Sequence, residues 1–201
     1  ESTGSTAYDA VGHLHTGALS GGMTFDANSV TGAVGSALSF DGVNDRILLN
    51  AISTIGQKDF TLSARVKFSS IPSGHAIGIV TIKHSGSSTA RVRFSIKDDG
   101  KLRYGLYTSA EGWRETSSGT SLADGQWRHV VVTYDRSGYA TGYVDGTPVG
   151  SVDISAITAP IQGQVYIGYD DYGGPGSFSG AIDDVRIYNR ILTADEIAAA
   201  P

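Results

Sequence analysis

Arginine and aromatic residues at alternate positions are the part of the sequence best suited to chemistry. In the runs 60–68, 92–97 and 102–107, if the apolar residues point inward, the intervening polar side chains must share the outward face. With Arg91, which directly precedes the second run, that outward set is Arg65, Lys67, Arg91, Arg93, Arg103 and Tyr107. Guanidinium groups make paired hydrogen bonds to carboxylates and other planar acceptors, and aromatic rings cover the apolar faces of sugars. We expect the runs to be neighbouring strands that form an open, basic groove, which could bind an acidic ligand.

Two further segments add aromatic rings and polar groups to this set. Trp113 and Arg114 follow the last run, and a polar loop further along contains Tyr169, Asp170 and Tyr172. The loop is longer than a hairpin needs, and such loops carry binding functions more often than packing functions. We therefore add these five residues to the predicted ligand site. The alternative remains open that the arginines only keep the strands soluble and protect sheet edges.

The elements that must position these side chains are short strands. Alternation with period two recurs in about a dozen segments separated by Gly-rich turns, and Asp-Gly pairs at 99–100 and 145–146 mark two hairpins. The pattern predicts an all-β fold, a two-sheet antiparallel β-sandwich that forms a single domain over 1–201, with 1–6 as a frayed lead-in. Helix is expected only near the C-terminus, where Thr193–Glu196 has the capping-box pattern.

Composition excludes several function classes. The 201 residues include 27 Gly and no Cys, so disulfides and thiol chemistry are excluded. The segment 58–114 carries ten basic and four acidic residues, but the whole chain has a net charge of −5. That total disfavours nucleic acid as a partner. No apolar run is long enough to span a membrane, so no membrane partner is expected.

Several motifs in a fixed order resemble the laminin G-like, concanavalin A-like jelly-roll domains. They are Gly35–Gly42 (GSALSFDG), Trp127–Val130 (WRHV), Tyr143–Gly146 (YVDG) and Gly180–Arg190 (GAIDDVRIYNR), and 8–22 is similar to the family's opening segment. The resemblance covers about residues 8–199 and implies a jelly roll, with Trp127 in the core. It also implies a monomeric module, fused to other domains of a secreted or cell-surface bacterial protein, that binds a polysaccharide or oligosaccharide. The basic groove favours an acidic one.

The resemblance further implies one structural Ca²⁺ ion, because many members of the family hold one. Ca²⁺ takes six to eight oxygen ligands from carboxylates, carbonyls and water, and in the family the first and last segments lie side by side. The predicted ligands are Asp9, the His13 carbonyl, Asp41 and Asp183, with Asp26 and Asp184 as substitutes. The alternative is that these acids cap turns, pair with arginines or face water.

Catalysis is the remaining question, since the same fold includes β-glucanases and alginate lyases. A retaining glycosidase needs two carboxylates about 5–5.5 Å apart. Glu111 and Glu115 are four residues apart with Gly112 between them, and neither the Glu-x-Asp-x-x-Glu strand of the glucanases nor the residue set of the lyases occurs. We expect a non-catalytic module. A protein-interaction or adhesion module, and a polysaccharide lyase or glycoside hydrolase, remain the alternatives.

Overall fold

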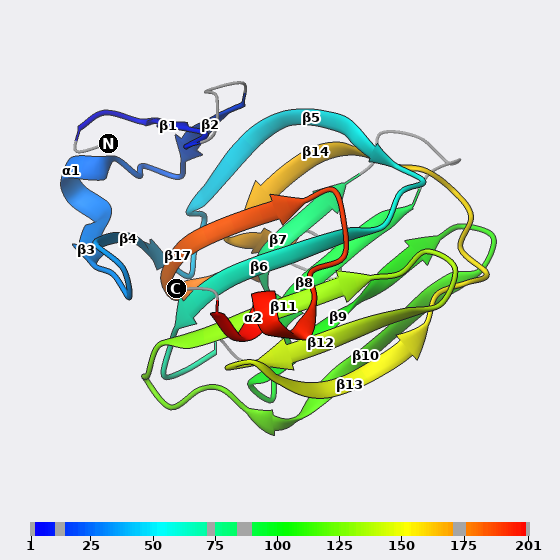
Figure 1. Ribbon diagram of the computed structural model, residues 1–201. Coiled ribbons are helices and arrows are strands. Elements are labelled where there is room, and N and C mark those ends of the chain that lie inside the picture. The colour runs from blue at the N-terminus through cyan, green and yellow to red at the C-terminus, as the bar shows by residue number, and fades with distance from the viewer. Residues whose placement is uncertain (1–2, 11–14, 72–74, 84–89, 171–175, 200–201) are drawn as a thin grey trace.

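The strands of the computed structural model form two antiparallel sheets that face each other (Figure 1), over the described residues 3–10, 15–71, 75–83, 90–170 and 176–199. The larger sheet has the order β1 (Thr6–Tyr8), β2 (Thr16–Ser20), β5 (Arg46–Gly56), β14 (Ile161–Ile167), β7 (Ile77–Lys83), β8 (Arg91–Ile96), β9 (Lys101–Thr108), β10 (Gly112–Ser121). The smaller sheet has the order β13 (Thr147–Asp153), β12 (Tyr139–Val144), β11 (Arg128–Tyr134), β6 (Phe60–Lys67), β17 (Ser179–Tyr188), β4 (Ser36–Asp41), β3 (Ser29–Thr31). A separate pair consists of β15 (Tyr169–Asp170) and β16 (Gly176–Ser177). The predicted sandwich is confirmed.

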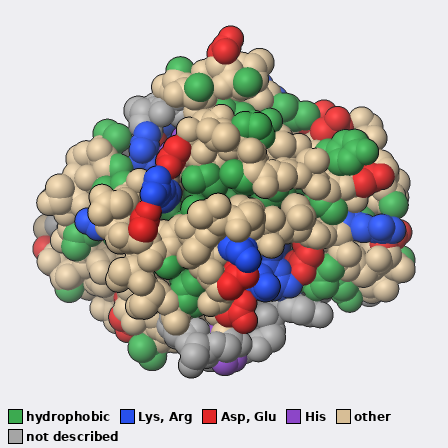
Figure 2. All heavy atoms as spheres, turned by 90° about the horizontal axis from the view of Figure 1, so that it is seen from below, with side chains coloured by type: hydrophobic (Ala, Val, Ile, Leu, Met, Phe, Trp, Pro, Cys, Tyr) green, Lys and Arg blue, Asp and Glu red, His purple; other side chains and the backbone are tan. Residues whose placement is uncertain are grey.

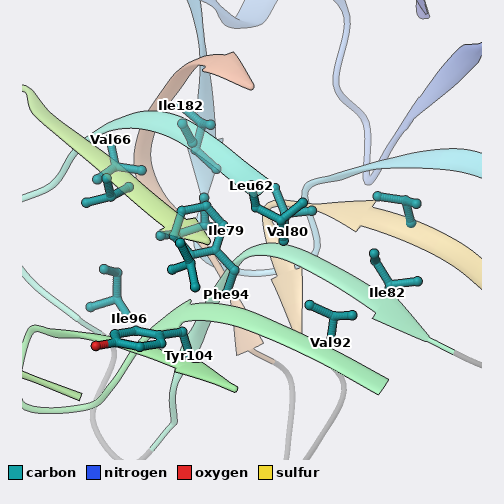
Figure 3. Packing of buried hydrophobic residues seen from close by; sticks show 14 of the residues in the cluster. Leu62, Val66, Ile79, Val80, Ile82, Val92, Phe94, Ile96, Tyr104 and Ile182 are labelled. Carbon is teal, nitrogen blue, oxygen red and sulfur yellow. The ribbon is translucent and has the colours of Figure 1, made fainter. Parts of the chain in front are cut away.

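The hydrophobic core fills the space between the two sheets. Leu62 and Val66 of β6 point toward Phe94 of β8 and Val80 of β7 across this space (Figure 3). Each strand contributes alternate residues because successive side chains of a strand point to opposite faces. The same alternation fixes which polar residues lie on the outer face of each sheet, which is the face turned away from the core.

Both predicted Asp-Gly hairpins are present. Gly100 turns the chain between β8 and β9 at a φ of +83°, and Asp145 and Gly146 turn it between β12 and β13. The expectation that residues 1–6 form a frayed lead-in is wrong for residues 4–6, which are held by backbone contacts. The Gly4 and Ser5 carbonyls accept backbone hydrogen bonds from downstream residues, both at 2.8 Å, and β1 begins at residue 6.

The C-terminal helix α2 (Ala194–Ala199) forms as the capping box predicts. The Glu196 N–H donates to Thr193 Oγ1 at 3.3 Å, and Thr193 N–H donates to Glu196 Oε2 at 2.8 Å. Helix α2 lies on the outer face of the smaller sheet, where Ile197 packs against Val131 (Figure 1). Among the described residues, neither α2 nor any other helix is long and apolar enough to cross a membrane.

One short helix, α1 (Phe25–Asn28), was not predicted. Its N-cap is Thr24, whose Oγ1 accepts the Ala27 N–H at 3.1 Å. The expectation that helix occurs only at the C-terminus is therefore wrong. Four residues are too few for a helical period to show in the sequence, and only the cap residue could have indicated this turn.

Candidate functional site

The residues of the predicted arginine groove lie on two different sheets. Arg91 and Arg93 lie on β8, and Arg103 and Tyr107 lie on β9, its neighbour in the larger sheet. Arg65 lies on β6 in the smaller sheet, so grouping it with the others is wrong. Alternation shows which side chains share one face of a strand, but it does not show which strands share a sheet. The candidate site is therefore the outer face of the larger sheet.

Arg93 is buried in this face rather than displayed on it, contrary to the prediction. Cross-strand pairing places Arg93 opposite Gly105, and Gly105 opposite Glu115. Because Gly105 has no side chain, the guanidinium of Arg93 extends across β9, and its Nη1 lies 2.8 Å from Glu115 Oε2. Its Nε donates to Asp170 Oδ2 at 3.1 Å, and only 1% of Arg93 is exposed. Arg93 thus joins β8, β10 and the loop after β14.

That loop folds back over the outer face of the larger sheet. It passes over β7 at Gly78, where any side chain would collide with the backbone of Tyr169. The hydroxyl of Thr81, also on β7, donates to the Tyr169 carbonyl oxygen at 2.8 Å. The crossing places Asp170 directly against Arg93 and leaves Asp170 only 2% exposed. The predicted loop therefore does reach the arginine-bearing strands, but its aspartate is buried.

Half-buried aromatic rings border the buried ion pairs on two sides. Arg93 Cζ lies 3.8 Å from the centre of the Trp113 ring, whose own centre lies 5.1 Å from that of Tyr107. Toward β14, the ring centres of Tyr166 and Tyr169 are 5.8 Å apart. We call these four rings the aromatic platform. Buried Arg93 covers one face of the Trp113 indole. The opposite face is therefore the one that solvent or a ligand can reach.

The positive charge of this face is partly matched by carboxylates. Glu115 forms ion pairs with both Arg93 and Arg103, and Asp170 forms a second pair with Arg93. Figure 2 shows a different side of the molecule, seen from below the view of Figure 1, and there too Lys and Arg side chains lie next to Asp and Glu side chains. Carboxylates therefore match the charge of the Arg93 and Arg103 part of the predicted basic groove. Ligand binding at this face stays a prediction.

The remaining predicted residues divide between the two faces. Arg91 pairs with Tyr107 across β8 and β9 and is half-buried beside the aromatic platform. Arg114 pairs with the inward residue Leu106, so its side chain leaves β10 on the face opposite to Trp113. Placing Arg114 in the same site as Trp113 is therefore wrong, because adjacent strand residues point to opposite faces.

Sequence reasoning missed two members of the site. Tyr166 lies between inward residues of β14, and the sequence left open whether it was core or half-buried; the structure places it half-buried on the outer face. Arg46 begins β5, and its Cζ lies 5.6 Å from the centre of the Tyr169 ring. No local signal indicated Arg46, since the contact depends on how the loop folds over the sheet. Tyr172 lies outside the described residues.

The two glutamates considered as a catalytic pair have different partners. Glu111 lies in the turn between β9 and β10, where its N–H donates to Thr108 Oγ1 at 3.0 Å and its carboxylate accepts the Thr108 hydroxyl. Glu115 binds the two arginines instead. The carboxylates of Glu115 and Asp170 do share Arg93, but a guanidinium holds both of them and Asp170 is 2% exposed.

Two of the predicted calcium ligands, Asp41 and Asp183, do not converge. Asp41 pairs with Ser179 on β17, and Asp183 lies four residues further along that strand, which corresponds to about 13 Å. Ca²⁺ binds its ligands at about 2.3–2.6 Å, so Asp41 and Asp183 cannot both hold one ion. Asp183 Oδ2 accepts the N–H groups of Ala33 and Val34 at 2.9 and 3.1 Å. Asp183 therefore caps the turn between β3 and β4.

The other proposed ligands also have backbone or side-chain partners. Burial raises the pKa of Asp41, but three backbone N–H groups of the following turn hold this pKa below its ordinary value. Asp26 Oδ2 accepts a backbone N–H at 3.2 Å, and Asp184 pairs with Arg186. Asp9 is described, and the His13 carbonyl lies outside the described residues. Within the described part of the chain, no three His, Asp or Glu side chains form a metal-binding group. Calcium binding stays a prediction.

Comparison with known proteins gives the same fold. A family model described as the concanavalin A-like lectin/glucanases superfamily matches residues 41–198, and no curated protein matches the chain. The binding domain of Paraclostridial Mosquitocidal Protein 1 has a TM-score of 0.74 at 16% identity; the match covers 95% of this chain but 48% of that one, so this chain spans about half its length.

Two other solved structures are also similar. Domain 4 of AbnA, a GH43 extracellular arabinanase from Geobacillus stearothermophilus solved with arabinotriose, has a TM-score of 0.64 at 20% identity, covering 85% of this chain and 78% of that one. A heptameric SAP-like pentraxin from Limulus polyphemus has a TM-score of 0.56 at 22% identity, covering 80% and 78%. At these identities the likeness establishes the fold alone.

Proposed function

The chain belongs to the concanavalin A-like lectin/glucanase superfamily, and from this premise we propose that it is a non-catalytic module that binds a polysaccharide. The observation that carries the proposal is the aromatic platform. Tyr107, Trp113, Tyr166 and Tyr169 are half-buried on one outer face, so each ring combines a fixed position with accessible surface. Large rings of this kind gain much from covering an apolar ligand surface at low entropic cost.

The ion pairs beneath the platform support this role by fixing its geometry. Trp113 rests on the Arg93 guanidinium, which is held in turn by Glu115 and Asp170. A ring that is already held in its binding orientation loses little freedom when a ligand arrives. Arg93 is thus a positioning residue and not a ligand contact. A single open platform still buries little ligand, so we expect a Kd of about micromolar to millimolar.

The charge distribution favours a neutral polysaccharide over the acidic one that the sequence suggested. Arg93 and Arg103 already pair with carboxylates, so ring stacking contributes more to binding than ionic attraction. Arabinan is the first neutral polysaccharide to test, since domain 4 of AbnA was solved with arabinotriose. That relative belongs to an extracellular enzyme, which supports the further proposal that this chain is part of a secreted, multidomain protein.

The same contacts support the absence of catalysis. A retaining glycosidase uses one carboxylate as nucleophile and one as acid, and both must reach the sugar. Asp170 is 2% exposed and Glu115 is bound by two arginines, so neither is placed for that task.

The test measures binding to a panel of soluble polysaccharides by affinity gel electrophoresis and calorimetry. The panel contains arabinan and xylan as neutral chains, and polygalacturonate and alginate as acidic ones. Tyr107→Ala and Trp113→Ala should each weaken binding about tenfold. The matched control is Tyr139→Ala, because Tyr139 is 55% exposed on β12 of the smaller sheet.

Four outcomes would contradict the proposal. Equal binding by Tyr107→Ala, Trp113→Ala and the unaltered chain would remove the platform as the site. Failure to bind any polysaccharide, together with capture of a defined protein ligand, would favour the protein-interaction alternative. Release of reducing sugars from any member of the panel would favour the hydrolase, and release of unsaturated products would favour the lyase.

A further inference from the structure

A depression on the outer face of the smaller sheet lies apart from the aromatic platform. Its volume is about 480 Å³, which lies within the range of small-molecule sites. It is lined by Lys67 of β6, Ser39 of β4, Ser179 of β17, Ser70 and Trp127. The two outer faces point in opposite directions, so a ligand in this depression cannot touch the platform.

The strand register explains why the surface is hollow here. Ser39 of β4 pairs with Ala181 of β17, and Ala181 pairs with Lys67 of β6. The first two side chains are small, so they form a low floor between taller neighbours. Gly180, beside this row, has no room for a side chain against the Lys67 backbone. The floor is therefore built from small residues, and at Gly180 beside it the packing of the strands requires a glycine.

Trp127 forms one wall of the depression, and its predicted place in the core is wrong. The next residue, Arg128, pairs with the inward residue Val66, so Trp127 immediately before it lies on the outward side, next to Lys67. The indole is half-buried and borders the depression. The sequence misled here because Trp127 precedes an apolar strand, and only the register shows on which side it lies.

The charge at the depression comes from Lys67. Its side chain is exposed, and among the described residues no carboxylate lies within ion-pair distance of the Lys67 ammonium. Ser39, Ser70 and Ser179 line the same depression and offer hydroxyl groups. This differs from the platform, where Glu115 and Asp170 already hold the arginines.

We propose that this depression is a second saccharide site, which binds a sugar unit carrying a carboxylate. The Trp127 indole would cover the apolar face of the sugar, the Lys67 ammonium would pair with the carboxylate, and the serine hydroxyls would bind the sugar hydroxyls. The proposal does not depend on the platform, and it gives the module two sites of different charge preference. Two sites on opposite faces would allow one module to bridge two glycan chains.

The two tryptophans of the chain make the test direct, because each candidate site contains one of them. In a ¹H–¹⁵N spectrum the two indole N–H signals report separately on the platform and on the depression, and Trp127→Phe assigns them. The probes are sodium glucuronate and glucose, which differ only in the carboxylate. Glucuronate should move the Trp127 signal at lower concentration than glucose does, and the Trp113→Phe variant should respond in the same way.

Substitution of Lys67 tests the charge. Lys67→Met should weaken glucuronate binding about fivefold and leave the response to glucose unchanged. The control Lys97→Met, at a half-exposed lysine in the turn after β8, should change neither. The proposal is overturned if glucuronate moves only the Trp113 signal, if Lys67→Met binds like the unaltered chain, or if sodium acetate produces the same shift. A null result at Trp127 with a normal response at Trp113 would leave the platform proposal intact.

Discussion

The two outer faces of the sandwich are covered by different means. On the larger sheet, a loop is held by the buried Arg93 between Asp170 and Glu115. On the smaller sheet, helix α2 packs through Ile197 against Val131, an apolar contact. A charged cover holds half-exposed rings in place and still leaves them accessible, whereas the apolar cover closes its part of the sheet. The difference teaches that polar contacts can hold an outer layer in place while its aromatic rings stay accessible, whereas apolar packing closes the strands beneath it.

The largest expected effect comes from breaking the charged cover. Arg93→Met removes the cation from Asp170 and Glu115 and leaves Asp170 buried without it, which should cost about 3–5 kcal/mol of unfolding free energy. Urea denaturation measures this loss. The matched control is Arg103→Met, which removes another partner of Glu115; since 26% of the Arg103 side chain is exposed, its loss should stay below about 1 kcal/mol.

A second substitution, at Asp170, separates the loss of the Arg93 charge from the loss of Arg93 packing. In the Arg93→Met/Asp170→Asn double variant no ionised carboxylate remains in the buried position, so part of the stability should return. Equal stability of the single and double variants would show that Arg93 acts by packing alone, and the contrast between the two faces would then disappear.

The second effect concerns the smaller sheet, where Asp183 holds a turn through backbone N–H groups. Asp183→Ala should cost about 2 kcal/mol, because the N–H groups of Ala33 and Val34 lose a charged acceptor. Asp183→Asn keeps one acceptor oxygen and should lose less. Thermal unfolding with and without EDTA distinguishes the roles: the loss should be the same in both. A loss that vanishes in EDTA would restore Asp183 as a calcium ligand.

The sequence predicts strand positions better than it predicts the site, for a physical reason. Alternation identified β11 at Arg128–Tyr134 and the inward residues of β6 and β8, because burial on one face leaves a period of two. Whether Arg65 and Arg93 share a sheet depends on strand order, which long-range pairing decides. The burial of Arg93 depends on a loop crossing at Gly78 and on the missing side chain at Gly105, and no local pattern records either contact.

A smaller effect tests the apolar cover of the smaller sheet. Thr193→Ala removes the side-chain oxygen that accepts the Glu196 N–H, and such a cap contributes about 1 kcal/mol. Chemical denaturation should show this loss, and Thr193→Ser, which keeps the hydroxyl, should show little. Glycan binding at the platform should not change in either variant. A loss of binding in Thr193→Ala would contradict the independence of the two faces.

The smallest effect is a pH dependence from His129 on the smaller sheet. Burial lowers the pKa of His129 below its ordinary value of 6.5, and the Arg65 charge lowers it further, while Asp145 and Asp184 oppose the change. The imidazole lies against Ser63, with Nε2 at 2.9 Å from Oγ.

Because the folded pKa of His129 is the lower one, the unfolded chain takes up the proton first as the pH falls below 6.5. Stability is therefore complete above that pH and decreases as the pH falls toward the folded pKa. Urea midpoints measured between neutral and mildly acidic pH should show this decrease, and His129→Gln, which cannot titrate, should show less of it. The platform contains no histidine, so Arg103→Met should keep the dependence of the unaltered chain. An identical slope in His129→Gln would assign the effect to another group.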